Sequence, residues 1–227
     1  MLKTLILWDI DGTLLHSTGA GMKALNRALN TVFGLSGSFE GIEFAGRTDK
    51  LIIRQIFERF GIEHSAENFS SYVEGYVAEL PSTLAANSAR VLPGISEILA
   101  QAAGHPELAQ GLLTGNLRRG AEVKLGYHDL WGYFPIGAFA DDSEIRDELG
   151  PRALERARAH WGVDFPLERV WVVGDTPHDV SCARALGARV LAVATGSSSS
   201  SDLARHGPDV VLESLADPSP FWRALGA

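Results

Sequence analysis

The chain has 227 residues, of which 45% are hydrophobic, and a formal net charge of -8. A nucleic-acid or anionic-membrane surface needs a clustered excess of Lys and Arg, so this acidic balance argues against both partners. The single cysteine, Cys182, excludes an internal disulfide and a zinc site made of several thiolates. We find no signal-peptide pattern and no apolar run of about 20 residues, so we expect a cytoplasmic protein with one core and an insert.

The first apolar run, LILW at residues 5–8, predicts a buried strand and ends at two carboxylates, Asp9 and Asp11. Side chains two residues apart in extended backbone point the same way, so these carboxylates can converge on one point. That point lies at the carboxyl end of the strand, where open α/β sheets bind ligands. Gly12 permits a sharp turn there, and Thr13 can hydrogen-bond it. We expect a functional site at this turn, although turn formers at a solvated strand end would look similar.

Residues 16–88 carry apolar positions at helical spacing and contain no convincing buried strand. Three segments show this pattern: GMKALNRALNTVFG, DKLIIRQIFERFG and ENFSSYVEGYVAELPSTLA. We therefore predict a helical domain at 16–88, inserted after the first strand and lying over the strand tips.

The rest of the chain alternates short apolar runs with helical patterns. The predicted strands are residues 5–8, 111–114, 170–173, 189–194 and a run near Asp209. The predicted helices between them are residues 95–103, 119–126, 151–161 and 179–187. Strand and helix in alternation predict an α/β fold with a doubly wound parallel sheet, built from residues 1–15 and 89–227.

A second pair of acids follows the strand predicted at 170–173, where Asp175 and Asp179 are separated by four positions. Acids on two strands at one sheet edge could hold a hard divalent cation such as Mg²⁺, which prefers oxygen ligands. Asp179 could instead cap the next helix, and capping is compatible with support of a metal.

The segment GLLTGN places Thr114, Gly115 and Asn116 at a strand end, before a helix that begins near Leu117. A hydroxyl and backbone N–H groups at a helix N-terminus can form a phosphate cradle. Thr-Gly-Asn is also ordinary turn chemistry, so this signal is weak alone. Together the three sites suggest phosphoryl chemistry, with one acid as nucleophile, another moving a proton and the rest holding a metal.

In chain order, DxDGT at residues 9–13, the strand-end Thr114 and GDxxxD at residues 174–179 form a specific set. With this set the whole chain resembles the haloacid dehalogenase superfamily, and within it the phosphoglycolate phosphatase-like enzymes with a helical cap. The resemblance implies a Rossmann-like core, an inserted α-helical cap domain, Mg²⁺ and an aspartyl-phosphate intermediate. It also implies the following roles: Asp9 is nucleophile and metal ligand, Asp11 is general acid/base and metal ligand through its carbonyl, Thr114 binds phosphate, Asp175 binds the metal, and Asp179 supports it.

One element departs from the family pattern. The family normally places a Lys before the helix that precedes the last acidic motif, but the corresponding segment, DDSEIRDELGPRALERA, contains none. Arg146 is our candidate replacement, because its guanidinium is a permanent cation suited to phosphate. Arg152 is the competing candidate, and either one could be an ordinary exposed Arg.

Substrate selection would come from the cap and from the stretch after the first motif. Arg47, in FAGRTD, is a candidate contact for a second anionic group, and His16 lies where relatives often carry an acid. His178 lies in the last acidic motif. Lone polar residues in loops are often structural, so both readings stay open for each of the three.

We therefore expect a Mg²⁺-dependent phosphatase that acts on a small phosphorylated metabolite. A phosphomutase of the same superfamily and a non-catalytic phosphometabolite-binding protein are the alternatives. A GxGxxA pattern at residues 19–24 would suggest a dinucleotide enzyme, but it does not directly follow its strand. The substrate stays open among phosphoglycolate, a nucleoside monophosphate and a sugar phosphate, as does the choice between monomer and homodimer.

Overall fold

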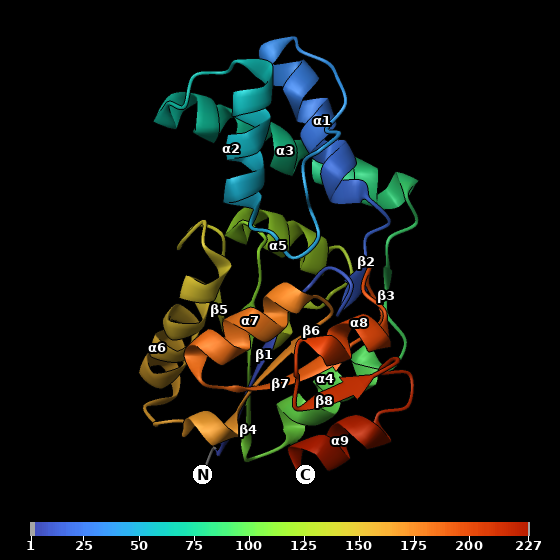
Figure 1. Ribbon diagram of the computed structural model, residues 1–227, viewed down its shortest axis with the longest axis vertical. Coiled ribbons are helices and arrows are strands. Elements are labelled where there is room, and N and C mark those ends of the chain that lie inside the picture. The colour runs from blue at the N-terminus through green and yellow to red at the C-terminus, as the bar shows by residue number, and fades with distance from the viewer. Residues whose placement is uncertain (1–2, 227) are drawn as a thin grey trace.

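The computed structural model describes residues 3–226 and is built around a six-stranded parallel sheet with strand order β5-β4-β1-β6-β7-β8 (Figure 1). Its strands are β1 (Thr4–Trp8), β4 (Leu108–Leu113), β5 (Ile136–Ala138), β6 (Val170–Gly174), β7 (Arg189–Val193) and β8 (Val210–Leu212). The predicted α/β sheet is confirmed, because β1, β4, β6, β7 and β8 lie on the five predicted runs. The sequence analysis missed β5, a three-residue edge strand.

Strand β1 lies at the centre of the sheet, where all five of its residues are buried. It pairs in parallel with β4 on one side and β6 on the other. Its side chains alternate between the two faces: Ile6 and Trp8 join one hydrophobic cluster, whereas Leu5 and Leu7 join the other. A strand that is buried on both faces must be apolar throughout, which explains the continuous run in the sequence.

Helices cover both faces of the sheet, as the hydrophobic clusters show. One face packs against α4 (Ile95–Gly104), α5 (Arg118–Gly126) and α9 (Ser219–Leu225). The other packs against α6 (Leu149–Trp161), α7 (Pro177–Leu186) and α8 (Ser200–Arg205). Three short 3₁₀ helices complete this part: η1 (Trp131–Tyr133), η2 (Arg146–Glu148) and η3 (Leu167–Arg169).

The segment predicted to be helical forms α1 (Ala20–Phe33), α2 (Asp49–Phe60) and α3 (Ala66–Ala86). These helices share a hydrophobic cluster that also includes Leu117 and Ala140 from the sheet part of the molecule. The buried Tyr72 hydroxyl of α3 donates to the Leu25 carbonyl of α1 at 2.9 Å. In Figure 1 they lie beyond α5, at the end of the molecule away from the labelled termini. The division of the chain into two domains at 16–88 remains a prediction.

The chain enters and leaves the helical segment through a small antiparallel pair, β2 (Leu15–His16) and β3 (Arg90–Val91). Leu15 is the register partner of Val91, and His16 that of Arg90. The two crossings are therefore side by side, beneath the three helices (Figure 1). Within residues 3–226, no helix combines the length and apolar character that a membrane crossing requires.

Candidate active site

A cavity of about 400 Å³ lies at the carboxyl ends of β1, β4 and β6 and is lined on its far side by α1, α2 and α3 and their loops. Most of the predicted site residues line it: Asp9, Asp11, His16, Arg47, Gly115, Asn116, Arg146 and Asp175. Among the described residues, Thr114 and Asp179 are buried next to this cavity rather than on its lining. The sheet edge therefore gathers acids and polar groups from segments far apart in the sequence.

Three buried carboxylates, those of Asp9, Asp175 and Asp179, form a compact cluster in which one ligand oxygen from each lies within 4.8 Å of the others. Burial raises the pKa of Asp9 to about 6, with Arg146 opposing the shift and Asp179 adding to it. Burial, together with Asp179 and Asp9, also raises the pKa of Asp175 well above its usual value. For Asp175 the repulsion from the other two carboxylates outweighs the attraction of the nearby cation, whereas for Asp9 burial is what raises the pKa.

That cation is Arg146, which is buried in η2. Its NH2 atom lies 3.2 Å from Asp9 Oδ1 and also hydrogen-bonds Asp179, while NH1 donates to the Gly46 carbonyl at 3.0 Å. The competing candidate, Arg152, is exposed on α6 and pairs with Glu155. Of the two arginines proposed to replace the missing Lys, Arg146 is therefore the one in contact with the carboxylate cluster.

Asp175 is held in place by close packing against the loops around it. The Thr13 hydroxyl donates to Asp175 Oδ1 at 3.2 Å. A Cβ added to Gly12 would come within 2.4 Å of Asp175 Oδ2, and one added to Gly196 within 1.7 Å. Gly12 also has a φ of +84°, which disfavours any side chain there. The Gly-Thr turn after β1 therefore shapes the space for a carboxylate that comes from another strand.

Asp179 combines the two roles that the sequence left open. Its Oδ2 accepts hydrogen bonds from the Thr176 N–H at 3.0 Å and from the Thr176 hydroxyl at 2.7 Å. The first of these, with the reciprocal bond from the Asp179 N–H to the Thr176 side chain, forms a capping box at the start of α7. Its Oδ1 faces Arg146. Asp179 therefore caps the helix and belongs to the carboxylate cluster at the same time.

The carboxylate cluster fits a divalent cation on its own chemistry. It offers oxygen ligands only, and three carboxylates share one guanidinium, so the buried charge is negative. A hard cation such as Mg²⁺ prefers such ligands and would relieve this repulsion. Burial is the largest cause of the raised pKa values of Asp9 and Asp175, and a bound cation would lower this cost of ionising them.

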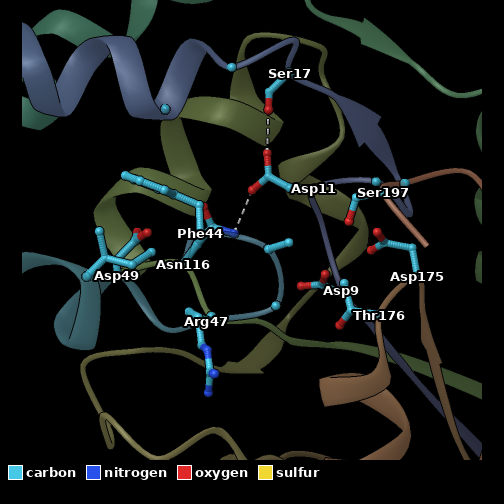
Figure 2. A pocket seen from close by; sticks show the side chains of 18 of the residues that line it. Asp9, Asp11, Ser17, Phe44, Arg47, Asp49, Asn116, Asp175, Thr176 and Ser197 are labelled. Carbon is cyan, nitrogen blue, oxygen red and sulfur yellow. Dashed lines mark hydrogen bonds between the residues drawn. The ribbon is translucent and has the colours of Figure 1, made fainter. Parts of the chain in front are cut away.

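Asp11 lies in the same cavity but turns away from this cluster (Figure 2). Its Oδ1 accepts from the Ser17 hydroxyl at 2.7 Å, and its Oδ2 accepts from Asn116 Nδ2 at 2.9 Å and pairs with Lys124 Nζ at 2.6 Å. Burial alone would raise the pKa of Asp11, but Lys124 and these hydrogen bonds outweigh it and hold the pKa below its usual range. The expected convergence of Asp9 and Asp11 on one point is thus not observed, because regular strand ends at Trp8 and each carboxylate has its own cation.

Lys124 is a site residue that the sequence analysis missed. It is 4% exposed, and its Nζ also lies 2.5 Å from Asn116 Oδ1. Burial works to lower the pKa of Lys124, but the charges of Asp11, Tyr76 and Asp49 raise it above its usual value. A faint signal was present, since Lys124 follows Ala121 by three positions and so falls on the buried face of α5.

Comparison with known proteins agrees with this geometry. Residues 6–184 match the model of a protein family described as "haloacid dehalogenase-like hydrolase". The chain is 26% identical to a Dickeya dadantii protein named "Probable phosphatase IndB" over 221 residues, which cover 95% of this chain and 92% of that protein. It is 24% identical to a phosphoglycolate phosphatase of Pseudomonas fluorescens, with 94% and 78% covered. A crystal structure of a hydrolase from Pseudomonas syringae has the same fold, with a TM-score of 0.73 and 21% identity over 98% of this chain and 99% of that one.

The chain belongs to the haloacid dehalogenase-like hydrolase family. The predicted family and enzyme class, a phosphoric monoester hydrolase, are confirmed by this match and by the phosphatases among the relatives.

The loop after β4 in this hydrolase differs from the phosphate cradle predicted from the sequence. The Thr114 hydroxyl accepts from Asn116 N–H at 3.3 Å and from Asn116 Nδ2 at 2.9 Å. The N–H of Leu117 donates to Asp49 at 2.8 Å, and that of Arg118 donates to Asp141 at 2.6 Å. Carboxylates of the protein therefore accept hydrogen bonds from two N–H groups at the start of α5, and the substrate contacts expected of Thr114, Gly115 and Asn116 remain predictions.

The loop before α2 ties the helical segment of the hydrolase to this sheet edge. Asp49 N–H donates to the Gly115 carbonyl at 2.7 Å, and a Cβ on Gly115 would come within 2.2 Å of the Arg47 carbonyl. The Arg47 side chain hydrogen-bonds Glu43 at 2.6 Å and 2.9 Å, and in Figure 2 it points away from Asp9. His16 is an exposed residue of β2 on the cavity lining. The proposed substrate contacts of Arg47 and His16 thus remain predictions.

The GxGxxA pattern begins at Gly19, which is the N-cap of α1. β2 and the turn after it separate this helix from β1. A dinucleotide fingerprint should join a sheet strand directly to its helix, so the location confirms the misfit noted in the sequence.

Proposed function

We propose that this hydrolase is a Mg²⁺-dependent phosphatase that hydrolyses a small phosphorylated metabolite through an aspartyl-phosphate intermediate on Asp9. The proposal rests on one observation: the carboxylates of Asp9 and Asp11 lie in the same cavity but have different partners. Asp9 lies with Arg146 in a cluster of three carboxylates, and Asp11 lies apart from it, held by Ser17, Asn116 and Lys124.

In the first step, a carboxylate oxygen of Asp9 attacks phosphorus, and the bond from phosphorus to the leaving oxygen breaks. Asp11, which its low pKa keeps ionised in the free enzyme, takes a proton from the bound substrate monoanion and passes it to the leaving oxygen, which departs as an alcohol. In the second step, a water molecule attacks phosphorus and gives a proton to Asp11. The bond from phosphorus to Asp9 breaks, phosphate leaves with the proton that Asp11 received, and both carboxylates return to their starting state.

Asp9, Asp175, the Asp11 carbonyl and, in support, Asp179 would hold the cation. When bound, Mg²⁺ supplies positive charge that offsets the repulsion between the phosphate and these carboxylates. Arg146 adds a fixed guanidinium beside Asp9, where charge develops on the phosphoryl oxygens. Thr114 binds phosphate in this proposal, since it follows β4, which pairs with β1 at the strand end that carries Asp9.

The size of the cavity supports a small substrate. Its volume of about 400 Å³ is at the lower end of the range for ligand pockets, about 300–1,000 Å³. The similarity to a phosphoglycolate phosphatase favours a small phosphorylated acid. A nucleoside monophosphate and a sugar phosphate are the other candidate substrates.

The first experiment measures phosphate release from 4-nitrophenyl phosphate by the wild type, with Mg²⁺ and with EDTA, beside Asp9→Asn. Asn is nearly isosteric but cannot act as the nucleophile, so turnover should fall by roughly 10³-fold or more while circular dichroism stays unchanged. EDTA should abolish wild-type turnover. Activity retained in Asp9→Asn would refute the aspartyl-phosphate mechanism.

A silent wild type would be followed by a panel of phosphorylated metabolites that includes phosphomutase substrate pairs. Phosphate transfer between two sugar positions without net release would identify a phosphomutase. Binding without turnover across the panel would identify a phosphometabolite-binding protein.

A further inference from the structure

Lys124 is a buried cation at the cavity that the mechanism above does not use. It extends from α5 to the cavity wall, and its Nζ contacts two acceptors, Asp11 Oδ2 at 2.6 Å and Asn116 Oδ1 at 2.5 Å. Gly21 of α1 and Tyr76 of α3 lie close to this ammonium group. A Cβ on Gly21 would be 3.5 Å from Lys124 Nζ and 3.8 Å from the Tyr76 hydroxyl. The ammonium group is thus enclosed between the sheet edge and the insert helices.

Packing alone does not explain a lysine at this position. Removing an ammonium group from water costs several kcal/mol, and an apolar side chain of similar length would fill the same space without that cost. Buried ion pairs are often no more stabilising than the apolar residues that could replace them. A buried lysine beside a reactive carboxylate therefore favours a role in the chemistry.

The hydrogen-bond pattern shows what Lys124 does to its neighbours. An ammonium group can only donate, so it requires the oxygen of the Asn116 amide to face it. The Asn116 nitrogen then faces Asp11 Oδ2 and the Thr114 hydroxyl, and donates to both at 2.9 Å. Lys124 thus holds Asp11 directly, through its own bond, and indirectly, by fixing the orientation of the Asn116 amide.

Together with Ser17, these groups restrain both oxygens of the Asp11 carboxyl. Figure 2 shows the result: Asp11 points toward Ser17 and Asn116, on the opposite side from Asp9 and Asp175. In an in-line displacement the leaving oxygen lies opposite the attacking one, so the acid that protonates it must be held away from the nucleophile.

We propose that Lys124 is a positioning residue that fixes the Asp11 carboxyl where it exchanges a proton with the leaving oxygen. This inference rests on the proposed phosphatase function and adds to it a residue outside the acidic motifs. Lys124 acts through Asp11, so its importance depends on how much the leaving group needs a proton.

The test compares two esters that differ in this need. Nitrophenolate leaves without a proton, whereas the alkoxide of benzyl phosphate must be protonated. For Lys124→Met, we expect kcat/KM to fall roughly 10²-fold with benzyl phosphate and less than about threefold with 4-nitrophenyl phosphate. Asp11→Asn should show the same selectivity with a larger loss, and Lys124→Arg should recover part of the benzyl phosphate activity.

Lys23→Met is the matched control, because Lys23 is an exposed lysine of α1 that is hydrogen-bonded to Asn87. It should leave both rates unchanged. If circular dichroism shows that Lys124→Met does not fold, Lys124→Gln, which keeps a donor, takes its place in the same comparison.

An equal loss with both esters, or no loss with benzyl phosphate, would overturn the positioning role while leaving the phosphatase proposal intact. A wild type that hydrolyses no phosphate ester at all would overturn the proposed function, and this inference with it. The two failures are therefore distinguishable.

Discussion

The cavity contains two buried cations, and their surroundings differ in charge. Arg146 faces the carboxylates of Asp9 and Asp179, with Asp175 close by, whereas Lys124 pairs with Asp11 alone and completes its contacts with an amide. Burial and mutual repulsion raise the pKa of Asp175, while Lys124 and hydrogen bonds overcome burial to lower that of Asp11.

This difference shows that one sheet edge can offer two environments, one suited to binding a cation and a phosphoryl group and one suited to holding a single carboxyl group. The Arg146 end has an excess of negative charge and oxygen ligands, so it is suited to a divalent cation and to the phosphoryl group that the cation neutralises. At the Lys124 end, hydrogen bonds from Ser17, Asn116 and Lys124 restrain both oxygens of the Asp11 carboxyl. This end is suited to holding one carboxyl group in a fixed position.

Of the two buried cations, Arg146 should have the larger effect on activity. Arg146→Ala deletes the guanidinium beside Asp9, so we expect kcat to fall by roughly 10²–10³-fold with 4-nitrophenyl phosphate. Arg152→Ala, at an exposed arginine of the neighbouring helix, is the control and should retain normal turnover. Near-normal turnover in folded Arg146→Ala would show that this end does not need its guanidinium.

A buried acid near Lys124 should make stability depend on pH. Burial raises the pKa of Asp49 from 3.8 to about 6, although Lys124 opposes the shift. The folded state therefore binds the proton more tightly than the unfolded state, and the stabilisation present below pH 3.8 is lost as pH rises through about 6. We expect the free energy of unfolding to fall by about 2–3 kcal/mol from this group over that window.

Asp49→Asn should remove this contribution, because Asn stays neutral and its oxygen can still accept from Leu117 N–H. Urea unfolding with EDTA, between about pH 4 and 7, measures the difference between the two proteins. Asp164→Asn, at a side chain that is 81% exposed, serves as the control. Parallel stability curves for wild type and Asp49→Asn would show that Asp49 is not protonated in this range.

The smallest expected effect concerns the shape of the Arg146 end. In Gly196→Ala the new Cβ would lie 1.7 Å from Asp175 Oδ2, so this carboxylate must move. We expect the Mg²⁺ concentration for half-maximal activity to rise about tenfold, in the range found when support of a metal ligand is lost. Gly104→Ala, where the Cβ meets no atom within 4 Å, should leave it unchanged. An unchanged Mg²⁺ requirement in Gly196→Ala would argue against Asp175 as a ligand.

The sequence was informative wherever a feature is local. Strand β1 and the acids after it could be predicted because a central parallel strand must be apolar and its end is marked by a turn. Strand β5 was missed because three residues at a sheet edge, one of them partly exposed, carry too little pattern. The pairing of Arg146 with Asp9 depends on a loop 137 positions further along the chain, so the sequence could offer it only as one of two candidates.

Lys124 shows the other limit of prediction from sequence. In the sequence it is an ordinary helical lysine, and it becomes part of the site only when α5 packs beneath Tyr76 and beside Asp11. The phosphate cradle was predicted from N–H groups at the start of the same helix. Two of these N–H groups donate to carboxylates: that of Leu117 to Asp49, 68 positions away, and that of Arg118 to Asp141, 23 positions away. Both outcomes depend on tertiary contacts that local pattern does not encode.

The antiparallel pairing of β2 with β3 has a consequence for how the helical segment is attached. Leu15 and Val91 are register partners, so the two ends of the 75 or so residues between them lie about 5 Å apart. A short hairpin turn would span that gap. The segment is thus an insertion whose attachment points are independent of the strand order that brings Asp9 and Asp175 together, although its residues form the far wall of the cavity.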